Sequence, residues 1–281
     1  MVKSNLPIEI SKSKFENHIS KHNKEEHSMK RLYLFLLTAL LLLPLFCSCV
    51  MTGEDETLTA RIVRIYPDAD ALLLAPMGMS EGQPPIFLSW EWHEQLTEGD
   101  CLVLTYRGGM VEEQSPYLNA PVFRPKKTVS VTTDGKRFDN LASIYLNVLT
   151  DLAKEEEQYF DGKTQLAIDI EETALPANEQ HAIAAAFAQM YPSMTVIEES
   201  RSDLKAKGFL TQLYDGPRWY WSDGVILKIY ENTKKCTDRS RYFGTSFNSG
   251  FTHGWSDCRT SRDADSGIWS AHKVGGLYMA D

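Results

Sequence analysis

The residues of this chain that could carry chemistry begin with a run of carboxylates at 169–172, Asp-Ile-Glu-Glu, which directly follows a predicted buried strand. Residues two apart in a strand share a face, so Asp169 and Glu171 have the arrangement of the acid and base of a glycoside hydrolase. Gln165 and Ala167 stand where an extended glycosidase motif would place further carboxylates. We therefore interpret the run as polar residues that leave a strand, and keep a glycan hydrolase as an alternative.

Nucleophilic and metal-dependent catalysis lack their usual motifs in this sequence. No Gly-x-Ser-x-Gly turn occurs. His253 precedes Cys258 closely, but a metal site normally needs three or four ligands at short spacing, and no second pair accompanies them. The glycine pairs at 108–109 and 275–276 lack the Lys-Ser/Thr and the helix start of a phosphate loop. We predict no catalytic residue, no metal site and no cofactor, and favour a protein that is not an enzyme.

Aromatic residues offer a binding surface instead. Trp90 and Trp92 lie two apart, and so do Trp219 and Trp221, so a strand would place each pair on one face. Packing in a core is the commoner role of such pairs. The alternative is a platform on which sugar rings or peptide aromatics stack. This hypothesis assigns ligand binding to four residues near the turn 222–224 and the glycine-rich segment 249–255: Trp219, Trp221, Asp223 and Trp255.

The N-terminal region has the features of an export signal. Met29 is followed by Lys30 and Arg31 and then by an apolar run, 32–46, that only Thr38 and Pro44 interrupt. At ~1.5 Å per residue a helix of this length reaches about 22 Å. That is short of a hydrocarbon core of about 30 Å, so a cleaved signal peptide at 29–48 is favoured over a permanent membrane span.

The same segment resembles a bacterial lipoprotein signal. Ser48 is the small residue before Cys49, and the resemblance marks Cys49 as the residue that receives diacylglycerol and becomes the new N-terminus. Phe46 departs from the family pattern, in which an aliphatic residue is usual, and makes Cys47 the poorer acceptor. The resemblance implies a lipoprotein with a palmitate-type acyl anchor, exported to the outer membrane or the cell surface.

Two segments flank this signal. The acidic tether 49–56 resembles the surface-export tag of Bacteroidetes lipoproteins, and an ordinary solvated linker is the alternative. Residues 1–28 are polar and lysine-bearing, and they are either a cytoplasmic tail or, as we favour, outside the true product because translation starts at Met29. The chain has 38 Asp and Glu against 29 Lys and Arg, a net charge of -9, and no basic cluster. Nucleic acid is therefore an unexpected partner.

Short apolar runs separated by turn residues predict a small all-β domain at 57–131. They lie at 58–65, 71–75, 86–88, 101–106, 110–111 and 129–131. About five or six strands of this kind fit a compact barrel such as the OB-fold. The order of these runs, with Gly99-Asp100 and Gly108-Gly109 between them, resembles a small uncharacterised barrel domain of bacterial lipoproteins, which implies no activity.

The remaining residues, 132–281, predict an α+β domain. An amphipathic helix begins near Leu141, a buried strand follows at 165–170, and a second helix runs from about Pro176 to Pro192. After a strand at 194–197 and a short helix at 202–207, the pattern turns to β. Helices first and strands later favour a mainly antiparallel sheet. Residues 138–280 resemble a second uncharacterised domain of exported bacterial proteins, which again implies no reaction.

The cysteines add one prediction. Cys236 and Cys258 flank a β-rich stretch in a compartment that permits oxidation, so we predict a disulfide between them, whereas Cys101 alternates within an apolar strand and is expected to be a buried free thiol. Together these observations favour a lipid-anchored cell-envelope protein, a ligand-binding or interaction module for a glycan or peptide, held at the membrane by its lipid. The alternatives are an envelope glycan hydrolase and a structural or assembly subunit.

Overall fold

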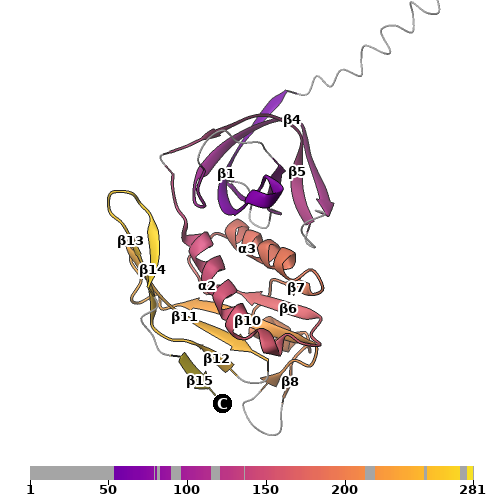
Figure 1. The fold of residues 1–281 in the computed structure, drawn as a ribbon, viewed down its shortest axis with the longest axis vertical. Helices are drawn as coiled ribbons and strands as arrows, with labels where there is room; N and C mark the ends of the chain where they lie inside the picture. The colour runs from indigo at the N-terminus through magenta and orange to yellow at the C-terminus, as the bar shows by residue number, and fades with distance from the viewer. Residues whose placement is uncertain are drawn as a thin grey trace, which may run out of the picture. The chain divides into compact units, whose positions relative to one another are not determined.

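The computed structural model (Figure 1) describes residues 54–78, 80, 83–89, 96–114, 121–135, 137–212, 219–249, 252–272 and 277–280. The signal peptide 29–48, Cys49 and most of the tether lie outside these residues, as do Trp90 and Trp92. The predictions made for them therefore stay predictions. Within the described part of the chain, no helix combines the length and the apolar composition needed to cross a membrane.

The first five strands form a sheet that closes on itself. They are β1 (Asp55–Tyr66), β2 (Ala71–Met77), β3 (Ile86–Ser89), β4 (Cys101–Gln114) and β5 (Pro121–Thr133). The hydrogen-bonded order is β1-β2-β3-β5-β4, and β4 pairs again with β1. A short 3-10 turn, η1 (Pro67–Ala69), joins β1 to β2. The all-β character predicted for residues 57–131 is confirmed.

The residues of the apolar run 71–75 are buried on both faces of β2. Leu72 and Leu74 point to the barrel interior and pack there with residues of the other strands. Ala71, Leu73 and Ala75 point the opposite way, and they are also fully buried, in a core that includes the helices of the following segment. A strand buried on both faces loses the alternation of apolar and polar residues, which explains the unbroken run.

The second sheet is built by the rest of the chain. Its strands are β6 (Gln165–Asp169), β7 (Thr195–Ile197), β10 (Gly224–Glu231), β11 (Ser240–Asn248), β12 (Thr252–Trp255), β13 (Cys258–Arg262), β14 (Trp269–His272) and β15 (Leu277–Ala280). The main order is β14-β13-β11-β10-β6-β7, and β12 pairs with β11 and β15. A separate two-stranded ladder joins β8 (Thr211–Gln212) to β9 (Trp219–Tyr220).

This sheet confirms the mainly antiparallel prediction and adds a parallel end. The strands β10 to β15 pair with one another only in antiparallel fashion among the described residues. Strand β6, in contrast, pairs in parallel with both β7 and β10. The β6–β7 pair is parallel because helix α3 (Ala177–Met190) carries the chain from the end of β6 back to the start of β7. The β6–β10 pair is parallel because the later connection, through β7 and the β8–β9 ladder, returns the chain to the same end of the sheet. The parallel end therefore follows from a crossover connection that local patterning does not specify.

Helices cover the two faces of this sheet unequally. Helix α2 (Leu141–Glu155) and α3 pack with alternate residues of the strands, among them Leu166, Ile168 and Leu227, in the main core (Figure 1). The short helix α4 (Arg201–Ala206) contributes Leu204 to a smaller core that contains Ile226. Successive residues of a strand face opposite sides of a sheet. Ile226 lies in the smaller core and Leu227 in the main core, so the two cores lie on opposite faces of the sheet.

The barrel and the second sheet share the main core and are tied together by polar contacts. Residues 53–281 form one compact unit. The hydroxyl of Ser143 on α2 donates to the carbonyl of Val63 at 2.9 Å, and the amide of Asn178 on α3 donates to the carbonyl of Pro76 at 3.0 Å. The two predicted domains, 57–131 and 132–281, therefore meet through a common interior.

Candidate functional site

The parallel end of the second sheet places polar groups at the carboxyl ends of neighbouring strands. From β6 the chain leaves through α3 toward β7, whereas from β10 it turns directly into β11 on the other side. Adjacent strands whose connections diverge leave a crevice outside their carboxyl ends, which is where open α/β sheets bind ligands. Asp169, the last residue of β6, lies at this point and is paired in register with Lys228 of β10.

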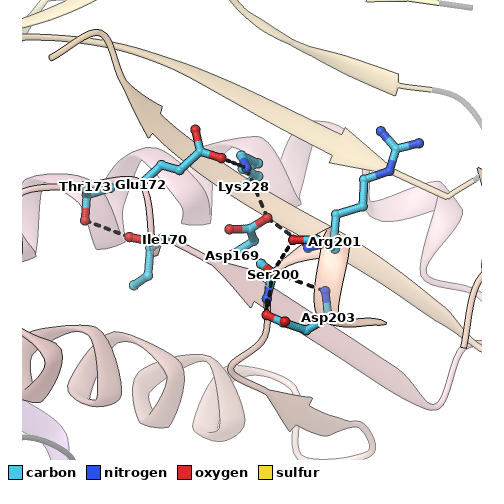
Figure 2. A network of polar contacts seen from close by, with 9 residues as sticks. Asp169, Ile170, Glu172, Thr173, Ser200, Arg201, Asp203 and Lys228 are labelled. Atoms are coloured by element: carbon cyan, nitrogen blue, oxygen red, sulfur yellow. Dashed lines mark hydrogen bonds and ion pairs between the residues drawn. The ribbon is translucent and has the colours of Figure 1, made fainter. Parts of the chain in front are cut away.

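Asp169 is held from two sides (Figure 2). Its Oδ2 accepts a hydrogen bond from the backbone N–H of Arg201 at 3.1 Å and lies 3.2 Å from the Nζ of Lys228. The residue is 1% exposed and its side chain is fully buried. Its second oxygen, Oδ1, is buried and has no hydrogen-bond partner among the described residues. One half of the carboxylate is thus fixed by the protein, and the other half is left to accept a hydrogen bond.

The pKa values of Asp169 and Lys228 are both raised by their surroundings. Burial raises the pKa of Asp169, against the opposing effects of the Arg201 N–H and of Lys228. For Lys228, burial lowers the pKa, but hydrogen bonds and attraction from Glu172 and Asp169 outweigh it and raise the pKa overall. The Lys228 Nζ lies 2.7 Å from Glu172 Oε1. Lys228 therefore stays cationic and is shared between two carboxylates.

The start of α4 keeps Arg201 in place. Ser200 is the N-cap of this helix, and its hydroxyl accepts a hydrogen bond from the Asp203 N–H at 3.3 Å. The Asp203 carboxylate in turn accepts from the Ser200 N–H, also at 3.3 Å, which completes a capping box. This box directs the Arg201 N–H at Asp169, as Figure 2 shows.

A cavity of about 190 Å³ opens beside these groups. Its lining is acidic, and none of the lining residues is basic: they are Ile168, Asp169, Ile170, Glu171, Gln180, Glu198, Glu199, Ser200 and Asp203. Glu198 pairs with His181, and hydrogen bonding to Glu198 raises the pKa of this histidine. Glu199 pairs with Lys207 through Oε1, and its Oε2 has no hydrogen-bond partner among the described residues.

The lining can accept hydrogen bonds but has few free donors. The Ser200 hydroxyl is engaged with Asp203, and the Gln180 amide donates to the Leu175 carbonyl at 2.9 Å. In the part of the chain that the structure describes, no group of three His, Cys, Asp or Glu side chains could hold a metal ion. The arrangement therefore suits a small ligand rich in N–H or O–H donors.

The prediction of a stacking platform is wrong for Trp221 and Trp255, two of its three tryptophans. Trp221 is 2% exposed in the smaller core under α4, and Trp255 is 7% exposed in the main core, so they lie on opposite faces of the sheet. Trp219 is half-buried, and the Nζ of Lys205 lies 4.0 Å from the centre of its ring. Asp223 is exposed, and its backbone carbonyl accepts the N–H groups of residues 164 and 165. Packing in the two cores therefore explains Trp221 and Trp255, whereas the binding role predicted for Trp219 and Asp223 stays a prediction.

The predicted disulfide is also wrong in this structure, where Cys101, Cys236 and Cys258 are free thiols. Cys258 is buried in the main core opposite Phe243. The Sγ of Cys236 instead accepts from the Tyr242 N–H at 3.4 Å and lies 3.7 Å from the Tyr242 carbonyl oxygen. The strand register therefore gives each sulfur different neighbours. Cys101 is buried, as expected.

The carboxylate run at 169–172 is the sequence feature that the structure places at the site. Asp169 and Glu171, which the sequence pattern predicts only as polar residues leaving a strand, both line the cavity, and no sequence-based prediction singles out Lys228 or the acidic segment 198–203. A signal for the second group was present: a short apolar strand followed by Glu-Glu-Ser has the same form as the strand before Asp169. Parallel pairing of β6 with β7 brings both strand ends to one edge.

A scan against protein-family models finds no match to this chain, and a search of curated proteins finds none either. What the site does must therefore be argued from its geometry.

Proposed function

We propose that this is an exported, lipid-anchored cell-envelope protein that binds a small, donor-rich ligand in the acidic cavity at the carboxyl end of β6. The observation that carries the binding proposal is the buried Oδ1 of Asp169, which lacks a partner among the described residues. A buried acceptor without a partner costs about 1–3 kcal/mol. A ligand that donates to it would offset this cost.

The cavity limits the size and charge of the ligand. At ~30 Å³ per water molecule, 190 Å³ is the volume of about six waters, enough for one small molecule or the end of one side chain. The surrounding carboxylates disfavour anions. Sugar hydroxyls and the cationic ends of peptide side chains both meet these requirements, which is consistent with a glycan or peptide ligand.

A glycan hydrolase remains the second candidate because of one specific observation. Asp169 is buried with a raised pKa, whereas Glu171 is exposed, and both line the same cavity. In glycoside hydrolases, two carboxyl groups in different environments usually serve as the protonated acid and as the ionised base or nucleophile. This candidate requires that bound glycans be cleaved.

The barrel fits the proposal as a scaffold. Its strand order, with β4 closing onto β1 and β3 pairing in parallel with β5, supports an OB-like fold. The outward-facing residues of β1 and β2 are buried in the main core, which the barrel shares with α2, α3 and the second sheet. We propose that the barrel spaces the binding site from the membrane, and a purely structural subunit is the outcome if no ligand is found.

The binding proposal is tested with the purified protein in a thermal-shift screen against monosaccharides, small amines and lysine- or arginine-bearing peptides. A binder should raise the unfolding temperature, by the equivalent of about 2.7 kcal/mol at a concentration of about 100 Kd. Asp169→Asn should abolish the shift, whereas Asp238→Asn, the same change at an exposed site, should not. An equal shift in both variants would refute the site, and released product from a glycan would favour the hydrolase.

Lipid anchoring is tested at Cys49. We expect Cys49→Ala to move the protein from the membrane fraction to the soluble fraction or to leave its signal unprocessed, because acyl chains contribute about 0.8 kcal/mol per buried methylene. Fractionation and mass spectrometry of the N-terminus provide the measurement, with Cys47→Ala as the matched control. An unchanged mass and membrane fraction for Cys49→Ala would contradict the anchor.

A further inference from the structure

We propose a second ligand site in the cavity between the β1–β2 turn and the last turn of α3, which takes a small uncharged molecule with an apolar body and a carboxamide-like group. This inference does not rest on the proposed function, because no residue lines both cavities. The cavity has a volume of about 400 Å³ and is lined by residues 64–69 together with Ala186, Gln189 and Met190. Ligand pockets usually have volumes of about 300–1,000 Å³.

Two residues that line this cavity each carry a buried polar atom that has no hydrogen-bond partner in the described part of the chain. The Oη of Tyr66 and the Oε1 of Gln189 are both buried, and neither has a hydrogen-bond partner among the described residues. Native proteins pair nearly all such atoms, so two in one cavity need an explanation. Burial raises the pKa of the Tyr66 hydroxyl, which therefore keeps its proton and remains a donor.

The two atoms together define the hydrogen-bonding group of the ligand. An amide oxygen only accepts, so the ligand must present an N–H or O–H to Gln189. The Tyr66 hydroxyl is able to donate, so an acceptor beside that donor completes the match. A carboxamide is the smallest common group that offers both, through its N–H and its carbonyl.

The other lining groups favour a neutral ligand with an apolar body. Arg64 already binds the Asn147 Oδ1 at 2.9 Å and lies 3.6 Å from Glu98, and Asp68 is an exposed charge of opposite sign at the same cavity. The remaining walls are apolar and come from Ile65, Pro67, Ala69, Ala186 and Met190. The ring of Tyr66 is packed against Phe87, with centroids 6.2 Å apart, which limits the movement of this side chain.

The test uses isovaleramide as the probe and methyl isovalerate as its control, since the ester has the same apolar body and a carbonyl but no donor. The protein carries Cys49→Ala and is taken from the soluble fraction, so that no detergent takes up the probe, and methyl-labelled methionine reports through NMR. We expect the Met190 methyl signal, assigned with Met190→Leu, to shift saturably with the amide and not with the ester. Tyr66→Phe and Gln189→Leu should each lower the affinity for the amide by about tenfold.

The free protein supplies the second measurement. An unpaired hydroxyl contributes no hydrogen bond to the fold, so Tyr66→Phe should leave the denaturant midpoint unchanged or raise it. Tyr242→Phe, the same change on β11 outside the cavity, should leave amide affinity unchanged. The proposal is overturned if the Met190 methyl signal shows no saturable shift with the amide, or shifts equally with the ester. It is also overturned if Tyr66→Phe binds the amide with unchanged affinity. A lower denaturant midpoint in Tyr66→Phe would overturn it too, because the hydroxyl would then already be paired in the free protein.

Discussion

Replacing Glu179 with alanine should lower the free energy of unfolding by about 3–5 kcal/mol, because it leaves the guanidinium of Arg61 buried without its charged partner. Arg61 lies on β1 and Glu179 on α3, and their side chains are 12% and 5% exposed. Burial raises the pKa of the Glu179 carboxyl and Arg61 opposes this effect. The Nε of Arg61 already lacks a hydrogen-bond partner among the described residues, so the cation has little alternative support.

Denaturant unfolding with two comparison variants separates this effect from a general loss of charge. Arg107→Ala breaks the pair with Asp55, in which Nε and Oδ1 are 2.7 Å apart but the side chains are 39% and 41% exposed, and should cost far less than the loss in Glu179→Ala because solvent screens the pair. The double variant Arg61→Met/Glu179→Leu should recover most of the loss, because an apolar pair needs no desolvation of charge. Equal small losses in Glu179→Ala and Arg107→Ala would show that the pair between β1 and α3 does not stabilise the fold.

The Gly254→Ala variant should be destabilised by about 3 kcal/mol or more. A Cβ built at Gly254 on β12 would lie 1.9 Å from the carbonyl oxygen of Thr245 and 3.0 Å from the Cα of Ser246, both backbone atoms of β11. Backbone cannot rotate away as a side chain can, so β12 and β11 must separate. The Trp255 N–H donates to the Thr245 Oγ1 at 3.0 Å in the same place and would be displaced with them.

Thermal unfolding and near-UV circular dichroism test this expectation. Gly135→Ala is the matched control, because a Cβ there meets nothing within 4 Å, and its stability should change by no more than about 0.5 kcal/mol. The near-UV signal of buried Trp255 should weaken in Gly254→Ala alone. If both glycine variants unfold at the temperature of the unchanged protein, the close approach of β12 to β11 is not maintained in solution.

The candidate site combines residues that a local pattern marks with residues that only contacts between distant parts of the chain bring together. The carboxylate run at 169–172 is visible locally as an apolar strand that stops in acids, but the same pattern is typical of polar residues that leave a strand, and the sequence alone assigns it no site. No local pattern marks Lys228, because it is 59 residues from Asp169 and its role comes from the parallel register of β6 with β10. The opposite error occurred with the tryptophans, whose spacing indicates a shared strand face but not whether that face is covered.

Local pattern alone determined the existence and type of most elements, including the strands around 58–65 and 71–75 and the helix that begins at Leu141, because side-chain periodicity is a property of neighbouring residues. The unbroken apolar run at 71–75 even carried the information that both faces of β2 are buried. Only the tertiary structure decided which strands pair, which sulfurs lie near each other and which carboxylate oxygen is left without a partner. These depend on contacts between residues far apart in the chain, and the free energy of such contacts is set by register and burial, which no local spacing encodes.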